Sequence, residues 1–274
     1  MSSQPFYTTL SDAIDDILQF GFDSKTRLDK WLERLAIVIP TALVPEATLD
    51  KNLQLSLQRV YARATSEARL AKLHPGIGAF TLQQVKPKLR AEFNRRIAAS
   101  ADLIKLNRRA SIGRTLQRFA GWMSSVPAGG SDVQSRAETK KQIKRGIAGL
   151  PFEERRVIID QGHKLNAALN DIIAVDGGAI AGKWRHVHRN DASYKARKAH
   201  VKRDGDVFLV RSSWADKARL VKGPYTDSIE QPAELPFCSC WYEFIYSLDE
   251  IPPEMLTAKG KQSHLETRRI MGVA

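Results

Sequence analysis

The chain has 274 residues, enough for one large domain or two small ones around a substantial core. Its 43 lysines and arginines outnumber its 30 aspartates and glutamates, and the formal net charge of +13 favours a polyanionic partner without indicating a fold. The longest apolar run, 35–44, is broken by Pro40, and no basic stretch followed by a hydrophobic one opens the chain, so we expect neither a membrane span nor a secretory signal.

The charge is distributed unevenly along the chain. Residues 1–50 hold eight acids and four bases, whereas residues 86–118 hold ten bases and two acids, and residues 183–211 hold nine bases and three acids. An acidic head and two basic blocks predict separate surfaces for separate partners, although each basic block is also compatible with a solvated helix face.

The first half of the chain has helical periodicity throughout. We expect helices over 11–20 and 24–39, each opened by a serine cap, and a longer one over 48–73 that ends at His74-Pro75-Gly76. From Thr81 to Trp122 the apolar spacing stays helical, with Gly113 as a candidate kink.

The second half alternates helices with short strands. We expect helices over 132–147 and 151–174, and strands over 181–187, 206–210, 219–221 and 240–246. This pattern predicts an α+β fold with a helical N-terminal domain and a small, mainly antiparallel sheet in the second. Because residues 126–132 are rich in glycine and small residues, we place a domain boundary there, giving domains 1–126 and 132–252 and a polar tail, 253–274.

The most strongly patterned unit lies between Asn190 and Val210. Asn190 or Asp191 can cap a helix that carries Tyr194, Arg197 and His200, and Asp204-Gly205 then ends it before a β-prone run.

These residues carry a resemblance to a known family. A tryptophan strand at Trp184 is followed by the order D-x5-R-x2-H-x3-DG-x2-F and then by a proline-flanked Cys-x-Cys. Over about 132–250 the chain resembles the phage Mu F-like head morphogenesis proteins, which are minor capsid proteins of tailed bacteriophages. Ser239 stands where many members have arginine, and an upstream Cys-x-x-Cys found in some members is missing. The motif residues are Trp184, Asp191, Arg197, His200, Asp204, Gly205, Phe208, Cys238 and Cys240.

The resemblance implies a role and a place. It implies a non-enzymatic virion protein without cofactors, inside the capsid or at the portal vertex, that is present in the host cytoplasm during assembly. It also implies partners, namely the portal protein, the major capsid protein or both, and double-stranded DNA bound without sequence preference. The two cysteines are too few for a disulfide framework, which agrees with a reducing compartment.

Arg197 and His200 lie three residues apart and project from nearly the same side of a helix. One interpretation is a phosphate-binding or acid–base cluster with Asp191 or Asp204. The other, which we favour because neither a nucleophile nor paired carboxylates accompany them, is an internal network that locks the helix onto the strand 206–210.

Cys238 and Cys240 point to the same face if the segment is extended. We favour buried free thiols and predict no metal; the alternative is a zinc site completed by His200, or by His186 and His188.

Phosphate contacts are predicted from the basic blocks, since lysine and arginine give salt-sensitive affinity without reading bases. Two alternatives remain, a metal-dependent nuclease of a phage or prophage that uses His186, His188 and Asp191, and a scaffold that never touches DNA. The predicted DNA-binding residues are Arg95, Arg96, Lys105, Arg108, Arg109, Arg114, Arg118, Lys195, Lys198, Lys202 and Arg203.

Overall fold

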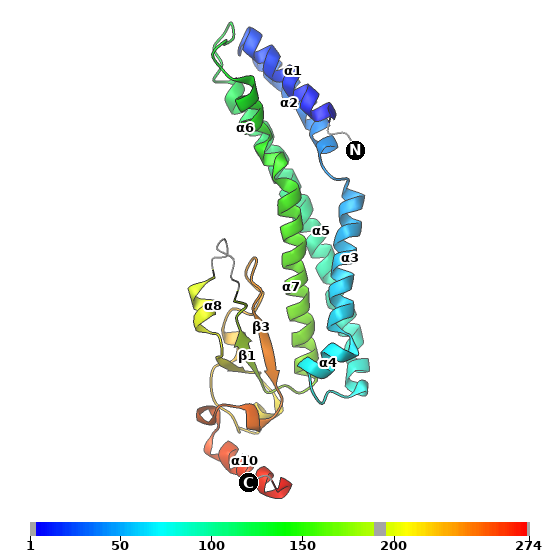
Figure 1. Ribbon diagram of the computed structural model, residues 1–274, viewed down its shortest axis with the longest axis vertical. Coiled ribbons are helices and arrows are strands. Elements are labelled where there is room, and N and C mark those ends of the chain that lie inside the picture. Colours follow the sequence, from blue (N-terminus) through cyan, green and yellow to red (C-terminus); the bar gives the residue numbers. More distant parts are fainter. Residues whose placement is uncertain (1–3, 189–195, 273–274) are drawn as a thin grey trace. The chain divides into compact units, whose positions relative to one another are not determined.

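The computed structural model describes residues 4–188 and 196–272 (Figure 1). The helices are α1 (Gln4–Phe20), α2 (Lys25–Val38), α3 (Glu46–Ala64), α4 (Glu67–Leu73), α5 (Ala79–Met123), α6 (Arg136–Ala148), α7 (Leu150–Asp176), α8 (Lys198–Lys202), α9 (Trp214–Lys217) and α10 (Ala258–Met271). The strands are β1 (Ala181–Arg185), β2 (Val207–Leu209) and β3 (Trp241–Ile245), with 3₁₀ turns at Ile39–Ala42, Thr226–Ser228, Leu248–Glu250 and Pro253–Met255. None of the helices within these ranges combines the length and the apolar character that crossing a bilayer requires.

The chain forms two compact units that are discontinuous in sequence. The first unit comprises residues 1–55 and 98–158, and the second comprises 56–97 and 159–274. The divisions fall inside α3, α5 and α7, and so differ from the predicted boundary at 126–132. The two units are described separately below.

The first unit has an all-helical core. Its apolar side chains come from α1, α2, α5 and α6 and include Phe6, Trp31, Phe119 and Ile143, each at most 6% exposed. Trp31 donates from Nε1 to Asp16 at 2.7 Å, which satisfies the one polar atom that this indole brings into the core.

The glycine-rich segment predicted to be a linker is a packed turn of the first unit. Gly129 donates to the carbonyl of Phe20 at 3.1 Å, and Ser131 donates to that of Leu18 at 2.9 Å. A Cβ on Gly130 would lie 2.2 Å from the Leu18 oxygen, and Gly130 has a φ of +90°. Glycine is therefore required here for close backbone approach to the end of α1, which is why its composition was misleading as a sign of a linker.

Arg108 and Glu154 form a buried ion pair in the first unit. Arg108 Nε donates to Glu154 Oε1, Nη2 lies 3.2 Å from Oε2, and both side chains are at most 6% exposed. The prediction that Arg108 contacts DNA is therefore wrong, because the bidentate carboxylate neutralises it inside the helix packing. No local pattern in the sequence indicates that Arg108 pairs with Glu154, 46 residues away.

The second unit contains the sheet. Its order is β2-β1-β3 with both pairings antiparallel, and Ala181 lies opposite Leu209 on one side and Ile245 on the other. Successive side chains alternate between two apolar clusters. Trp184, Phe208 and Phe244 lie in one, and Ala181, Leu209 and Ile245 lie in the other. The α+β prediction is confirmed.

Several predicted element bounds needed correction. The helix predicted over 48–73 is interrupted at Thr65 and Ser66, and α1 begins at Gln4 instead of at residue 11. Residues 219–221 form only an isolated bridge, between Val221 and Leu256.

The region predicted to be a separate tail packs into the second unit. Thr257 caps α10 through its hydroxyl and donates to the carbonyl of Arg219 at 2.8 Å. Gly260 approaches Leu220 so closely that a Cβ would lie 2.0 Å from the Leu220 oxygen. The segment is therefore attached to the second unit as far as His264, which contacts Asp249, whereas residues 265–270 are exposed.

We expect Glu154→Gln to lower the free energy of unfolding by about 3–5 kcal/mol, because it leaves the buried Arg108 charge unpaired. Urea unfolding followed by circular dichroism measures this. The exposed neighbour provides a control, with Glu153→Gln changing the free energy by less than about 0.5 kcal/mol. The double replacement Arg108→Met with Glu154→Leu should recover most of the loss. An effect of Glu154→Gln no larger than that of the control would contradict the assignment.

Candidate functional site

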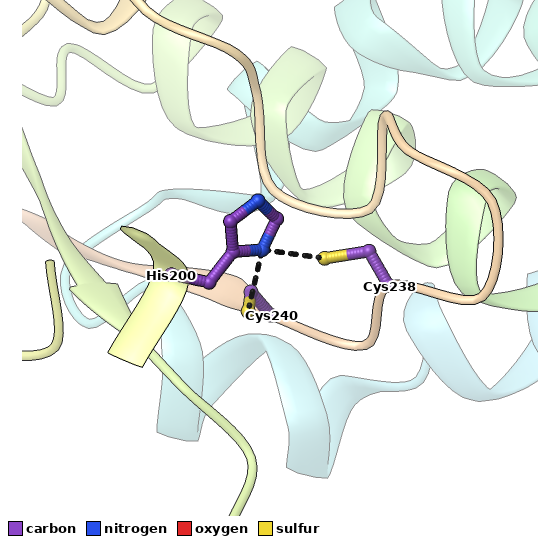
Figure 2. A group of neighbouring side chains, drawn as sticks. All are labelled: His200, Cys238 and Cys240. Atoms are coloured by element: carbon purple, nitrogen blue, oxygen red, sulfur yellow. Dashed lines mark hydrogen bonds between the residues drawn. The ribbon is translucent and has the colours of Figure 1, made fainter. Parts of the chain in front are cut away.

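A histidine and two cysteines converge in the second unit. His200 lies in the short helix α8, and Cys238 and Cys240 lie in the segment immediately before β3. Their side chains are 2–4% exposed. Figure 2 shows the imidazole of His200 turned toward both sulfur atoms. His200 Nδ1 is 3.4 Å from Cys238 Sγ and 3.6 Å from Cys240 Sγ.

Backbone contacts hold the two segments in place. Gly205, at a φ of +94°, allows the tight turn between α8 and β2, and it donates to the carbonyl of Trp184 at 2.9 Å. Arg197 donates from Nη2 to the carbonyl of Pro236 at 2.8 Å. From α7, the buried Asp160 accepts from the amide of Phe237 at 2.5 Å. The segment that carries both cysteines is therefore fixed from two sides.

Arg197 and His200 both reach one segment, but not through the predicted helical spacing, because Arg197 is the extended N-cap residue that precedes α8. That segment is 236–240 and not the strand 206–210, because Arg197 reaches Pro236 and His200 reaches both cysteines. Only the His200 part of the predicted internal network is buried, with a different partner, and the Arg197 hydrogen bond lies at the surface. Asp191, the predicted cap of the helix, lies outside the described residues, and α8 begins only at Lys198.

Aromatic side chains close one side of the cluster. Trp184 meets the His200 ring edge-to-face at a centroid distance of 5.3 Å and meets Tyr242 at 5.8 Å. The guanidinium of Arg203 lies 5.4 Å from the centroid of the Trp184 ring. These contacts fix the orientation of the imidazole and cover one side of it.

The second ring nitrogen of His200 faces a carboxylate. Nε2 is 3.6 Å from Glu230 Oε2, which is also 3.7 Å from Arg203 Nη1. Among the described residues, Nε2 has no hydrogen-bond partner at normal distance. A buried ring nitrogen without a hydrogen bond destabilises the folded state. The hydrogen-bonding contacts that hold the ring are therefore those of Nδ1 with the two sulfur atoms.

The two thiols titrate as a pair. A hydrogen bond with Cys240 lowers the pKa of the Cys238 thiol to about 5, and the same contact raises the pKa of the Cys240 thiol. The nearby His200 adds to the lowering of the Cys238 pKa. The shifts favour the thiolate form of Cys238 over that of Cys240, and the thiolate is the form that binds metal ions.

Asp204 binds the residues that follow β1 and does not bind Arg197 or His200. Its carboxylate accepts from the His186 amide at 2.9 Å and lies 3.0 Å from His188 Nε2. These two hydrogen bonds, the first being the stronger cause, lower the pKa of Asp204. The ring of His186 contacts Cys240, with Nδ1 3.4 Å from Sγ.

The cluster supplies the ligands of a soft or borderline metal ion. Across 4–188 and 196–272, the only group of three or more histidine, cysteine or acidic side chains placed to share an ion is His200, Cys238 and Cys240. Their ligand atoms all lie within 4.8 Å of one another. No carboxylate belongs to this group, so it does not provide the oxygen-rich site that the nuclease alternative requires.

The predicted DNA-binding residues are divided between the units. In the first unit Arg109, Arg114 and Arg118 are exposed and Lys105 is half-buried on α5. In the second, Arg95 and Arg96 both bind Glu92, which occupies part of their charge. Lys198 and Lys202 are exposed on α8, Arg203 covers Trp184, and Lys195 lies outside the described residues.

A second buried histidine was not predicted. His74 is 2% exposed; its Nδ1 lies 2.6 Å from the Tyr246 hydroxyl and its Nε2 lies 3.4 Å from Asn170 Oδ1. Burial is the main reason that its pKa is lowered. In the sequence, His74-Pro75-Gly76 signals only a helix end, and nothing local indicates partners 96 and 172 residues away.

Comparison with known proteins leaves the family open. None of the protein-family models, curated proteins or solved structures compared with the chain matches it. The resemblance to the Mu F-like family therefore stays a prediction.

We expect stability to fall between about pH 7.5 and about pH 5.5, partly through His74. Its pKa is lowered in the folded state, so below its unfolded value the unfolded chain gains a proton that the folded chain resists, and unfolding becomes more favourable. Denaturant unfolding of wild type and His74→Gln at both pH values measures this. The variant keeps the other five histidines, so its stability should fall less; an equal fall would show that His74 does not contribute.

Proposed function

We propose that this chain is a minor head protein of a tailed bacteriophage, acting in head assembly at the portal vertex and contacting packaged DNA. The main support for the proposal is the position of the motif residues that resemble those of the Mu F-like family. Trp184, His200, Phe208, Cys238 and Cys240, far apart in sequence, pack into one interior at 0–6% exposure. Buried motif residues stabilise the module and leave its surface for contacts with other molecules.

The interior also argues for binding in place of catalysis. A general acid or base has to come within hydrogen-bond distance of its substrate, and His200 is enclosed by Trp184 and by the cysteine segment. Asp204 is occupied by the His186 amide and by His188. The nuclease alternative is therefore the weaker proposal.

Exposed cations on the first unit support contact with nucleic acid. Arg109, Arg114 and Arg118 follow α5 at spacings of five and four residues. On the same unit, α6 adds the exposed Lys141 and Arg145, whereas Lys140 and Lys144 are half-buried. Side chains of this kind bind phosphates by charge and counterion release, without reading bases. Such contacts suit a protein that meets whatever DNA is packaged.

The virion role predicts that the protein is present in purified phage particles. Quantitative mass spectrometry of virions produced by a prophage or phage that encodes the chain should detect it at far lower copy number than the major capsid protein. Its presence only in infected-cell lysate, and not in particles, would contradict a virion component and favour an assembly factor or an enzyme.

DNA binding predicts a steep dependence on salt. For duplex DNA of unrelated sequences, log affinity should fall linearly with log salt, and Arg109→Gln/Arg114→Gln/Arg118→Gln should reduce the slope by up to about 0.9 for each lost phosphate contact. Fluorescence anisotropy over a salt series measures both. A control with the same charge change, Lys25→Gln/Lys30→Gln/Lys51→Gln, removes exposed lysines of the same unit and should leave the slope unchanged. Equal slopes for wild type and both variants would reject this interface, and nicking of plasmid with Mg²⁺ or Mn²⁺ would favour the nuclease.

A further inference from the structure

We infer that His200, Cys238 and Cys240 form a zinc site, with His200 Nδ1 and the two sulfur atoms as ligands and water in the fourth position. The inference concerns the fold of the second unit and does not depend on the virion role. It replaces the prediction from the sequence that the thiols are simply buried and that no metal is bound.

The two nitrogen–sulfur distances are those expected around a tetrahedral ion. With zinc–sulfur bonds of about 2.3 Å and a zinc–nitrogen bond of about 2.0–2.1 Å, tetrahedral angles place nitrogen and sulfur about 3.6 Å apart. The observed separations from His200 Nδ1 are 3.4 Å to Cys238 and 3.6 Å to Cys240. Figure 2 shows both sulfur atoms on the Nδ1 side of the ring, as shared coordination requires.

The surroundings of His200 match those of a metal-bound imidazole. When Nδ1 binds an ion, the proton must sit on Nε2, and metal-binding histidines usually donate that proton to a carboxylate or carbonyl. Glu230 Oε2 stands 3.6 Å from Nε2, a distance that a small side-chain shift converts into a hydrogen bond. The otherwise unpartnered Nε2 is thereby accounted for.

His186 completes the surroundings without joining the ligands. Its Nδ1 is 3.4 Å from Cys240 Sγ, where it can donate to the thiolate, but it does not belong to the group whose ligand atoms lie within 4.8 Å of one another. A hydrogen bond of this kind stabilises the charge on the sulfur. Three protein ligands with a fourth exchangeable position are then the expected coordination.

A cavity adjoins one of the ligand residues. Cys240 and Ser239 line a cavity of about 300 Å³ together with Arg69, Lys72, His163 and Asn166. Water, chelators and alkylating reagents are small enough to enter such a space. Exchange of the ion is therefore open to measurement in the intact protein.

An ion at this position has a clear physical consequence. It cross-links α8 to the segment before β3, closing chain loops of 38 and 40 residues between ligands. Helix α8 has only five residues, too short to be stable alone. Metal binding to the folded chain would add directly to the stability of this unit.

The test uses the full chain, expressed with added zinc and purified without chelators. Mass spectrometry of metal content should find one zinc per chain in wild type and none in Cys238→Ser, Cys240→Ser or His200→Ala. A control, His264→Ala, changes a histidine whose partner is Asp249 and should keep the zinc. Glu230→Gln should weaken zinc binding by about 10-fold or more, whereas the exposed Glu254→Gln should not.

Two further readouts on wild type keep the test decisive if the ligand variants fail to fold. Cobalt added to chelator-treated protein should give the intense visible bands of tetrahedral coordination together with thiolate charge transfer. Alkylation of the cysteines should be slow until a chelator is added. Metal content no higher than in a Cys238→Ser/Cys240→Ser variant, a weak octahedral cobalt spectrum, or a Cys238–Cys240 disulfide in the purified protein would each overturn the inference.

Discussion

The contact between one imidazole nitrogen and two sulfur atoms is the constraint on which the second unit depends. It joins a five-residue helix to an irregular segment, and neither is stable alone. Trp184 packs against this contact from β1, and Asp160 holds the cysteine segment from α7. A helix, a strand and a loop from distant parts of the chain are thereby fixed around a single point.

Polar groups buried in pairs recur through the molecule. Arg108 with Glu154 in the first unit, and His74 with Tyr246 and Asn170 in the second, each place charged or polar atoms inside packed helices or against the sheet. Such pairs add little net stability when complete, but they penalise every arrangement that separates the partners. They specify which elements pack together in a protein whose helices are otherwise similar amphipathic segments.

The positive charge has two uses that composition alone does not separate. Arg108 is neutralised internally, Arg95 and Arg96 bind Glu92, and Arg203 covers Trp184. The positive charge that is free to bind a polyanion is therefore smaller than the formal net charge. It lies on exposed side chains such as Arg109, Arg114 and Arg118. The proposed DNA contact therefore depends on the exposed cations of particular helices and not on the total net charge of the chain.

By itself, the sequence determined the local elements and the fold class. Hydrophobic periodicity, serine caps and glycine stops are local signals. They correctly indicate that Ser24 caps α2 and that Gly205 ends the turn after α8, and three of the four predicted strands form the antiparallel sheet. Only the tertiary structure decided which distant side chains meet. Three such contacts are Arg108 with Glu154, His200 with Glu230, and Gly130 with the Leu18 carbonyl. They depend on how the helices and loops fold back on one another, which hydrophobic periodicity does not encode. For the same reason, a glycine-rich turn packed against a helix end looked, in sequence, like a free linker.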